Sequence, residues 1–279
     1  GDIDNIKPLV TNEPTYTNDV PTDLITPENL GTQQMKYQKA ARAKSWSGMD
    51  LARGIALQDP MMGITNRIGD YWATDNQKRL IYSLQGILAD NVANDGGDLL
   101  HNVATDAAGA ITDAEKASAL NFIKALELTG DRLDMIGAFG IHSSVYYGLY
   151  AMNLITFVRE SEDASFAVFQ GKRVIVDDAL VVVQGANRPK YTSILFGVGA
   201  VQAGEGNMPN TLASEMDRNP DAGNGGGETR IYSRRTDIIM PIGFSFTGAS
   251  VAAKSATYAE LQAAANWDRV WDAKNIPIR

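Results

Sequence analysis

Residues 59–94 read DPMMGITNRIGDYWATDNQKRLIYSLQGILADNVAN, and this stretch decides the fold. Asp59 can cap a helix whose first residue is Pro60, where the missing N–H of proline costs no hydrogen bond. Apolar residues then recur at steps of three and four, which predicts a single long helix with one apolar stripe. At ~1.5 Å per residue the helix would be about 50 Å long, so we expect a strut along which other segments pack. The stripe consists of Ile64, Ile68, Tyr71, Trp72, Leu80, Leu84, Ile87, Leu88 and Val92.

The composition limits the classes of protein to which the chain can belong. With 279 residues it can bury a sizeable core in one large domain or two intermediate ones. Its net charge of −8 argues against a protein whose main affinity is for nucleic-acid phosphates. The absence of Cys excludes disulfides, thiolate metal sites and a Cys nucleophile. No apolar run is long enough to span a membrane, so we expect no membrane partner.

The segment before the long helix differs in character from a folded core. Pro8, Pro14, Pro21 and Pro27 recur among Thr, Asn and Asp, which favours extended backbone. It is either a disordered tail or an arm that becomes ordered on a partner. The basic stretch that follows is either a solvated face or a projection that meets an acidic neighbour, where complementary charge sets register. Its candidate contact residues are Lys36, Tyr37, Lys39, Arg42, Lys44 and Trp46.

The remaining segments mix short helices and strands, and segregated helices with mostly non-alternating strands favour the α+β class. Capping-box spacings at Thr112 and Glu115 and at Thr257 and Glu260 predict two helix starts. The sequence around Gly171 predicts a hairpin. Expected helices are 48–58, 112–129, 143–154 and 257–265; expected strands are 133–140, 166–170, 172–176, 180–183, 191–201, 229–239, 241–246 and 275–278; and 204–227 is expected to be a long surface loop.

A search for catalytic and binding motifs finds none that is complete. The two histidines are His101 and His142, and no nucleophile elbow accompanies either of them. Gln202 stands where a dinucleotide-binding fingerprint needs its third glycine. Asp177 and Asp178 have no further carboxylates at metal-ligand spacing. We therefore expect no catalytic residues, no cofactor and no metal, with a soluble hydrolase that uses His142 kept as an alternative.

Several blocks of sequence, taken in order, resemble the major capsid proteins of tailed bacteriophages. Together they cover most of the chain from Trp46 to its end. The resemblance implies the α+β fold often called the Johnson fold, which these proteins share with encapsulins. The blocks are 46–52, 58–61, 69–72, 77–88, 141–146, 169–178, 241–244, 266–267 and 274–277.

The resemblance also implies a division of the chain into the parts of such a subunit. The extended loop would lie over a neighbouring subunit and would carry the six candidate contact residues. The implied parts are an N-terminal arm at 1–22, the extended loop at 23–48, a peripheral domain at 49–130 with a spine helix at 59–94, an axial domain at 131–228, a return to the peripheral domain at 229–254, and a C-terminal helix and strand against the axial domain at 255–279.

The function implied by the resemblance is structural. Copies of the chain would assemble into hexamers and pentamers of an icosahedral capsid that encloses double-stranded DNA. Assembly would take place in the cytoplasm of the host bacterium, and the product would be the virion capsid. Further partners would be scaffold, portal and decoration proteins, with packaged DNA touched only non-specifically. An encapsulin-like nanocompartment shell is the alternative within the same fold.

Overall fold

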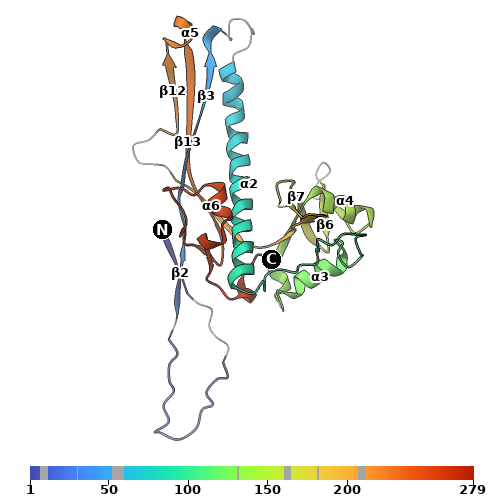
Figure 1. Cartoon of the computed structure of the whole chain (residues 1–279). Coiled ribbons are helices and arrows are strands. Elements are labelled where there is room, and N and C mark those ends of the chain that lie inside the picture. Colours follow the sequence, from blue (N-terminus) through green and yellow to red (C-terminus); the bar gives the residue numbers. More distant parts are fainter. Residues whose placement is uncertain are drawn as a thin grey trace.

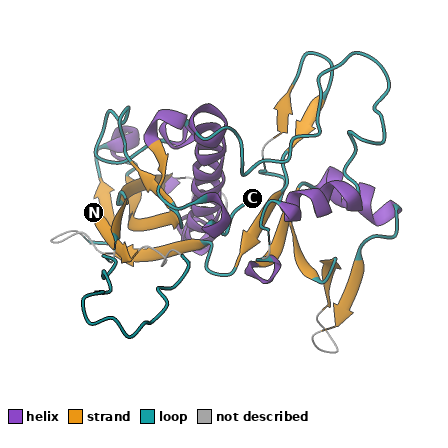
Figure 2. Cartoon of the chain, turned by 90° about the horizontal axis from the view of Figure 1, so that it is seen from below, coloured by secondary structure: helices purple, strands orange, loops and turns teal. Residues whose placement is uncertain are grey.

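The computed structural model describes residues 1–6, 12–29, 31–51, 60–130, 132–159, 165–180, 182–206 and 212–279. Figure 1 shows an elongated part built along one long helix, a lobe at its side, and a long loop that projects from one end. Figure 2, seen from below, shows that the lobe joins the elongated part near the C-terminus of the chain. Within the described residues, no helix combines the length and the apolar character that crossing a membrane would require.

The long helix α2 spans Pro60–Asn94, which confirms the predicted strut. Its predicted cap, Asp59, lies outside the described residues. Of the predicted stripe, Trp72, Leu84 and Ile87 are buried, and Ile81, which was not predicted, is buried beside them. Four further stripe residues are half-buried: Ile64, Ile68, Leu80 and Leu88. Val92 is wrong as a stripe residue, because it is 56% exposed in the last turn of the helix.

A four-stranded antiparallel sheet lies along the upper half of α2 (Figure 1). The central strand β13 pairs with β3 on one edge and with β12 and β11 on the other. The surface loop predicted for 204–227 is therefore wrong. Pairing with β13 supplies backbone hydrogen bonds to this polar segment, and Arg234 adds an ion pair to Glu215 at 2.9 Å. The elements are β3 (Ala40–Met49), β11 (Val201–Gly206), β12 (Ser214–Asn219), α5 (Ala222–Gly225) and β13 (Glu228–Pro241).

The helix predicted for 48–58 is wrong at its start, because Gly48 and Met49 are the last residues of β3. Their backbones pair with Thr229 and Glu228 in the register of the sheet, which holds them extended. Residues 52–58 of the predicted helix lie outside the described part of the chain.

A two-stranded hairpin projects from the elongated part. Strand β1 (Asp2–Ile6) pairs antiparallel with β2 (Thr32–Lys36), and the chain between them forms the long loop of Figure 1. The base of the hairpin is anchored in the core, because Met35 is 1% exposed and packs with Met240 and Ile242. The predicted arm and the first part of the predicted extended loop are thus the two sides of one projection.

The lobe is a five-stranded sheet with two helices packed on one face. Three aromatic rings, of Phe122, Phe139 and Phe169, pack edge to face with centroids 5.2–5.6 Å apart. The hairpin at Gly171 is confirmed, since β6 pairs antiparallel with β7 there. The lobe elements are α3 (Ala119–Glu127), a 3₁₀ turn (Leu133–Met135), β4 (Ile136–Ile141), α4 (Ser143–Ala151), β5 (Thr156–Arg159), β6 (Ser165–Phe169), β7 (Lys172–Val176) and β10 (Ile194–Gly197).

Two helix boundaries in the lobe differ from the expected ones. The Glu115 carboxylate accepts from the backbone N–H of Thr112, which is one half of the predicted capping box, but Glu115 N donates to Thr112 O and the pair closes only a turn. Helix α3 begins seven residues after Thr112, with Ser118 as its N-cap. Helix α4 begins at Ser143 as predicted, but its cap is the ring of His142, and it ends at Ala151, before the predicted Leu154. In both helices the start is set by a hydrogen bond that the cap side chain accepts from a backbone N–H of the first turn, rather than by sequence spacing.

The C-terminal segment packs against the lower half of α2, and its last residues then run along the lobe. The predicted capping box at Thr257 and Glu260 is confirmed at the start of α6. The last residues run beside β10, with Gly197 N donating to Pro277 O at 2.6 Å, but the predicted strand is reduced to one bridge at Ile278. The elements are β14 (Phe244–Phe246), α6 (Tyr258–Gln262), β15 (Trp267–Arg269), 3₁₀ turns at Ala264–Asn266 and Ala273–Asn275, and a separate hairpin of β8 (Val182–Gln184) and β9 (Pro189–Tyr191).

Candidate assembly surfaces

The six predicted contact residues do not form one exposed surface. Lys36, Lys39 and Lys44 are exposed, Trp46 is half-buried, and Tyr37 packs against the core at the base of the projecting hairpin. The backbone N–H of Tyr37 donates to Gly1 O at 2.9 Å, which closes that base. Only part of the predicted set is therefore available to a neighbouring molecule.

Arg42 is used inside the subunit. Its side chain is 13% exposed and forms ion pairs with Asp75 of α2 and Asp237 of β13. Its guanidinium also donates to Asn76 at 2.8 Å and lies over the ring of Trp72, 5.3 Å from the centroid. This arginine therefore holds the sheet against the long helix.

Lys44 and Trp46 belong to a surface that continues across α2. The side chain of Ser233 accepts from Trp72 of α2, and Lys44 is its partner in the pairing of β3 with β13, so Lys44 lies on the face of the sheet toward α2. Trp46 meets the ring of Tyr71 edge to face at 5.2 Å. Sequence reasoning had assigned Tyr71 to the buried stripe, but it is 37% exposed.

Two cations of α2 extend this surface. Arg67 and Lys78 lie one turn before and two turns after Tyr71, so the three side chains share one face of the helix. Both cations and Lys44 are exposed, and none of the three has an ion pair among the residues that the structure describes. We call Lys44, Trp46, Arg67, Tyr71 and Lys78 the basic–aromatic track.

The projecting loop has the opposite charge. Residues 12–29, which we call the acidic tip, contain no Lys or Arg, and their carboxylates are Glu13, Asp19, Asp23 and Glu28. Hydrogen bonds within the tip shape it, with Asn18 Nδ2 donating to Asp23 at 2.7 Å and Asn12 Nδ2 to Glu28 at 3.1 Å.

Large apolar side chains of the acidic tip face solvent. Leu24 is 87% exposed, Ile25 is 74% exposed and Tyr16 is 76% exposed. Leaving such a side chain in water forgoes about 1.5–3 kcal/mol of burial free energy per residue. Figure 1 shows the acidic tip at one end of the molecule and the upper half of α2 at the other, so the tip does not meet the track of its own chain.

A second cluster of exposed aromatic residues lies on the lobe. Tyr146 stacks on Tyr150 with ring centroids 6.3 Å apart, and Tyr150 meets Phe157 at 6.2 Å. Tyr147, Tyr150 and Phe157 are each more than half exposed. This cluster is a second surface on which the subunit exposes apolar area.

His142 has a structural place. Its Nδ1 accepts a hydrogen bond from the backbone N–H of Ser144 at 3.1 Å, which caps α4. The carboxylate of Asp178 lies 3.9 Å from Nε2 and also accepts from the N–H of Ser143 at 3.2 Å. The ring packs against Tyr191 at 4.9 Å. Because Nδ1 accepts the capping hydrogen bond, this imidazole serves as the N-cap of α4.

Comparison with known protein families gives a match over most of the chain. The family model described as "Major capsid protein 13-like" matches residues 57–276. The major capsid protein of Bacillus phage SPP1 is 32% identical over 259 residues, which cover 92% of this chain and 75% of that protein.

Two solved structures confirm the expected α+β fold of tailed-phage shell proteins. The capsid asymmetric unit of cyanophage Pam1 matches with a TM-score of 0.57 and 10% identity over 86% of this chain and 80% of that one. The head structure of Helicobacter pylori bacteriophage KHP40 matches with a TM-score of 0.53 and 9% identity over 87% and 77%. At such identity these likenesses concern the fold alone.

Proposed function

This chain belongs to the Gp13-like family of major capsid proteins, and we propose that its copies join in the shell by laying the acidic tip of one copy on the basic–aromatic track of another. It is a structural subunit of a tailed-phage capsid and not an enzyme. The alternative of a hydrolase that uses His142 is therefore wrong. The proposal concerns how the subunits hold one another.

Charge and apolar area support this contact together. Four carboxylates of the acidic tip would face the three cations of the track, which have no ion pair within the described part of the chain. Leu24 and Ile25 would cover the rings of Trp46 and Tyr71. Each exposed ion pair contributes only about 0.2–1 kcal/mol, and ordering the tip opposes binding. One such contact is therefore weak. Many of them in a closed shell give cooperative assembly that can still correct its errors.

The same contact supports a proposed division of the chain. β1, the acidic tip and β2 together would be the extended loop, in place of a separate arm at 1–22 and loop at 23–48. The lobe would be the axial domain, and α2 with the four-stranded sheet would be the peripheral domain. β11 and β12 pair with β13, which favours placing them in the peripheral domain although they fall within 131–228.

Membership of this family also supports proposals about the complete capsid and its partners. We propose hexamers and pentamers of this subunit around double-stranded DNA, built in the cytoplasm of a bacterial host with scaffold, portal and decoration proteins. The matching family and the SPP1 relative are phage capsid proteins, which favours this assembly over an encapsulin-like compartment. Co-purification of shells with packaged DNA, rather than with a cargo enzyme, would distinguish the two.

Reversing the charge of the track tests the contact. The variant Lys44→Glu, Arg67→Glu and Lys78→Glu would turn attraction to the acidic tip into repulsion. We expect about a tenfold smaller contact equilibrium constant, corresponding to about 1.4 kcal/mol, and far fewer shells by sedimentation and negative-stain microscopy. Reversing the four carboxylates of the tip to Lys in the same chain should restore assembly.

The matched control reverses three exposed lysines away from the track. Lys124→Glu, Lys254→Glu and Lys274→Glu give the same net charge as the track variant and should assemble like the unaltered chain. Equal loss of assembly in both triple variants would mean that net charge acts, and the proposed contact would be abandoned.

A further inference from the structure

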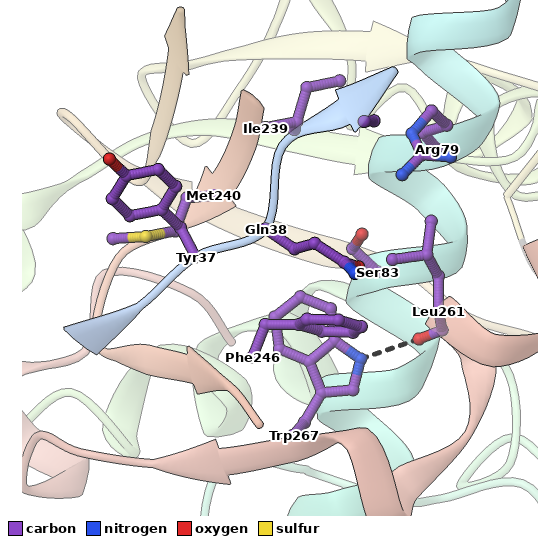
Figure 3. A pocket seen from close by; sticks show the side chains of 10 residues that line it. Tyr37, Gln38, Arg79, Ser83, Ile239, Met240, Phe246, Leu261 and Trp267 are labelled. Carbon is purple, nitrogen blue, oxygen red and sulfur yellow. Dashed lines mark hydrogen bonds between the residues drawn. The ribbon is translucent and has the colours of Figure 1, made fainter. Parts of the chain in front are cut away.

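A small cavity lies in the core beneath the base of the projecting hairpin, and its volume is about 20 Å³. Figure 3 shows its walls. Arg79 and Ser83 come from α2, and Gln38 comes from the connector between β2 and β3. The rings of Phe246 and Trp267 lie on the other side. The cavity therefore lies where the long helix, the connector and the C-terminal segment meet.

Arg79 is the charged residue of these walls, and it is 9% exposed. A guanidinium has five N–H donors. Among the described residues, the one hydrogen bond found for this side chain runs from Nη1 to the carbonyl oxygen of Ala256, at 3.0 Å. Burial lowers the pKa of Arg79, and repulsion from Arg42 lowers it further. Arg79 lines the cavity, so its other N–H groups can donate to an occupant.

The two buried carboxylates that pair with Arg42 are already engaged. Asp75 pairs with Arg42, and Asp237 pairs with Arg42 and lies 3.5 Å from Nε of Arg235. Glu205 also contacts Arg235, but its side chain is 69% exposed. The charge of Asp237 also acts on Arg79, but among the described residues Arg79 itself forms no ion pair. A buried charge without a full partner is costly, which favours a negative occupant beside the cavity arginine.

We infer that the cavity binds one small monovalent anion of about the size of chloride. A cavity needs roughly 10–15 Å³ to hold one water, so this one has room for a single-atom ion. Arg79 would supply the charge, and the hydroxyl of Ser83 and the amide of Gln38 can donate hydrogen bonds. A water molecule would satisfy the donors but not the charge.

The occupant would connect the projecting hairpin to the core. Gln38 lies in the connector, and its Nε2 already donates to the carbonyl oxygen of Lys254 at 2.9 Å. An anion held between Gln38 and α2 would fix the direction in which the hairpin leaves the subunit. Chloride should therefore slow amide hydrogen exchange at residues 37–39.

Thermal unfolding of the unassembled subunit tests the site. At equal ionic strength, we expect the melting temperature to be a few degrees higher in sodium chloride or bromide than in sodium gluconate. Arg79→Met should remove this difference. Lys124→Met, at an exposed cation of α3 outside the track, should keep it. Equal melting temperatures of the unaltered chain in chloride and gluconate, or an unchanged difference in Arg79→Met, would overturn the inference.

A second measurement serves if Arg79→Met does not fold. Crystals of the unaltered subunit grown in sodium bromide should show an anomalous scattering peak between Arg79 and Ser83. A cavity that is empty or holds only water in those crystals would refute the anion site.

Discussion

Replacing Gly86 with alanine is expected to lower the free energy of unfolding of the subunit by about 3 kcal/mol. At this point α2 approaches the C-terminal segment so closely that a Cβ would overlap the carbonyl oxygen of Leu261 and the indole of Trp267. Trp267 Nε1 donates to Leu261 O at 2.7 Å, so neither group can move without the other. Overpacking costs about 1–3 kcal/mol, and the upper end applies where backbone must shift.

Gly69→Ala is the matched control in the same helix. Apart from its chain neighbours and the backbone of the helix, no heavy atom of the described residues lies within 4 Å of the position its Cβ would take. The better helix propensity of alanine should therefore stabilise the subunit by about 1 kcal/mol. Thermal unfolding of the two unassembled variants should shift the melting temperature in opposite directions. A Gly86→Ala subunit that melts at or above the unaltered chain would show that α2 and the C-terminal segment are not packed this closely.

Arg42→Met is expected to be as damaging, for an electrostatic reason. It leaves Asp75 and Asp237, whose side chains are 12% and 4% exposed, without their shared cation. Breaking a buried ion pair by removing one partner costs about 3–5 kcal/mol. We expect a loss in that range in denaturant unfolding, together with faster hydrogen exchange in β3, which Arg42 ties to α2.

The double variant Arg42→Met with Asp75→Asn separates charge from packing. It removes one cation and one anion together, and Asp237 keeps Arg235 at 3.5 Å. We expect the double variant to recover most of the stability lost in the single one. A double variant as unstable as Arg42→Met alone would mean that the contacts of the side chain with Trp72 and Asn76, and not its charge, hold the sheet to the helix.

Local patterns predicted the elements that depend on local physics. The long helix follows from its stripe, the hairpin at Gly171 from a turn in which Gln170 and Gly171 both have positive φ, and the start of α6 from its capping box. In each of them the decisive contacts lie within a few residues in sequence.

The elements that were missed depend on contacts that are distant in sequence. β12 is exposed along most of its length, so it shows no apolar alternation, and its partner β13 supplies its order. The sequence alone places Arg42 on the surface, because no residue near it in sequence indicates its ion pairs with Asp75 and Asp237. Register across a sheet cannot be read from one strand alone.

In the candidate assembly surfaces, too, some features follow from local sequence and others only from contacts that are distant in sequence. The predicted charge complementarity between subunits stays a prediction, and we now propose it with the basic side on the track and the acidic side on the projecting loop. A signal for the tip was present in the sequence, since residues 12–29 contain four carboxylates and no cation. Arg67 and Lys78 share a face with Tyr71 at helical spacing, but only the structure shows that this face borders β3.

The central claim is that the acidic tip of one copy lies on the track of another, and disulfide trapping tests it most directly. The chain has no Cys, so engineered pairs report without background. Subunits with Asp23→Cys are mixed with subunits carrying Lys44→Cys, assembled, and oxidised mildly. A disulfide needs Cα atoms about 4.4–6.8 Å apart. We predict a mixed dimer on non-reducing gels, and none when Lys124→Cys replaces Lys44→Cys. Shells that form normally while neither Asp19→Cys nor Asp23→Cys cross-links to Lys44→Cys would contradict the account.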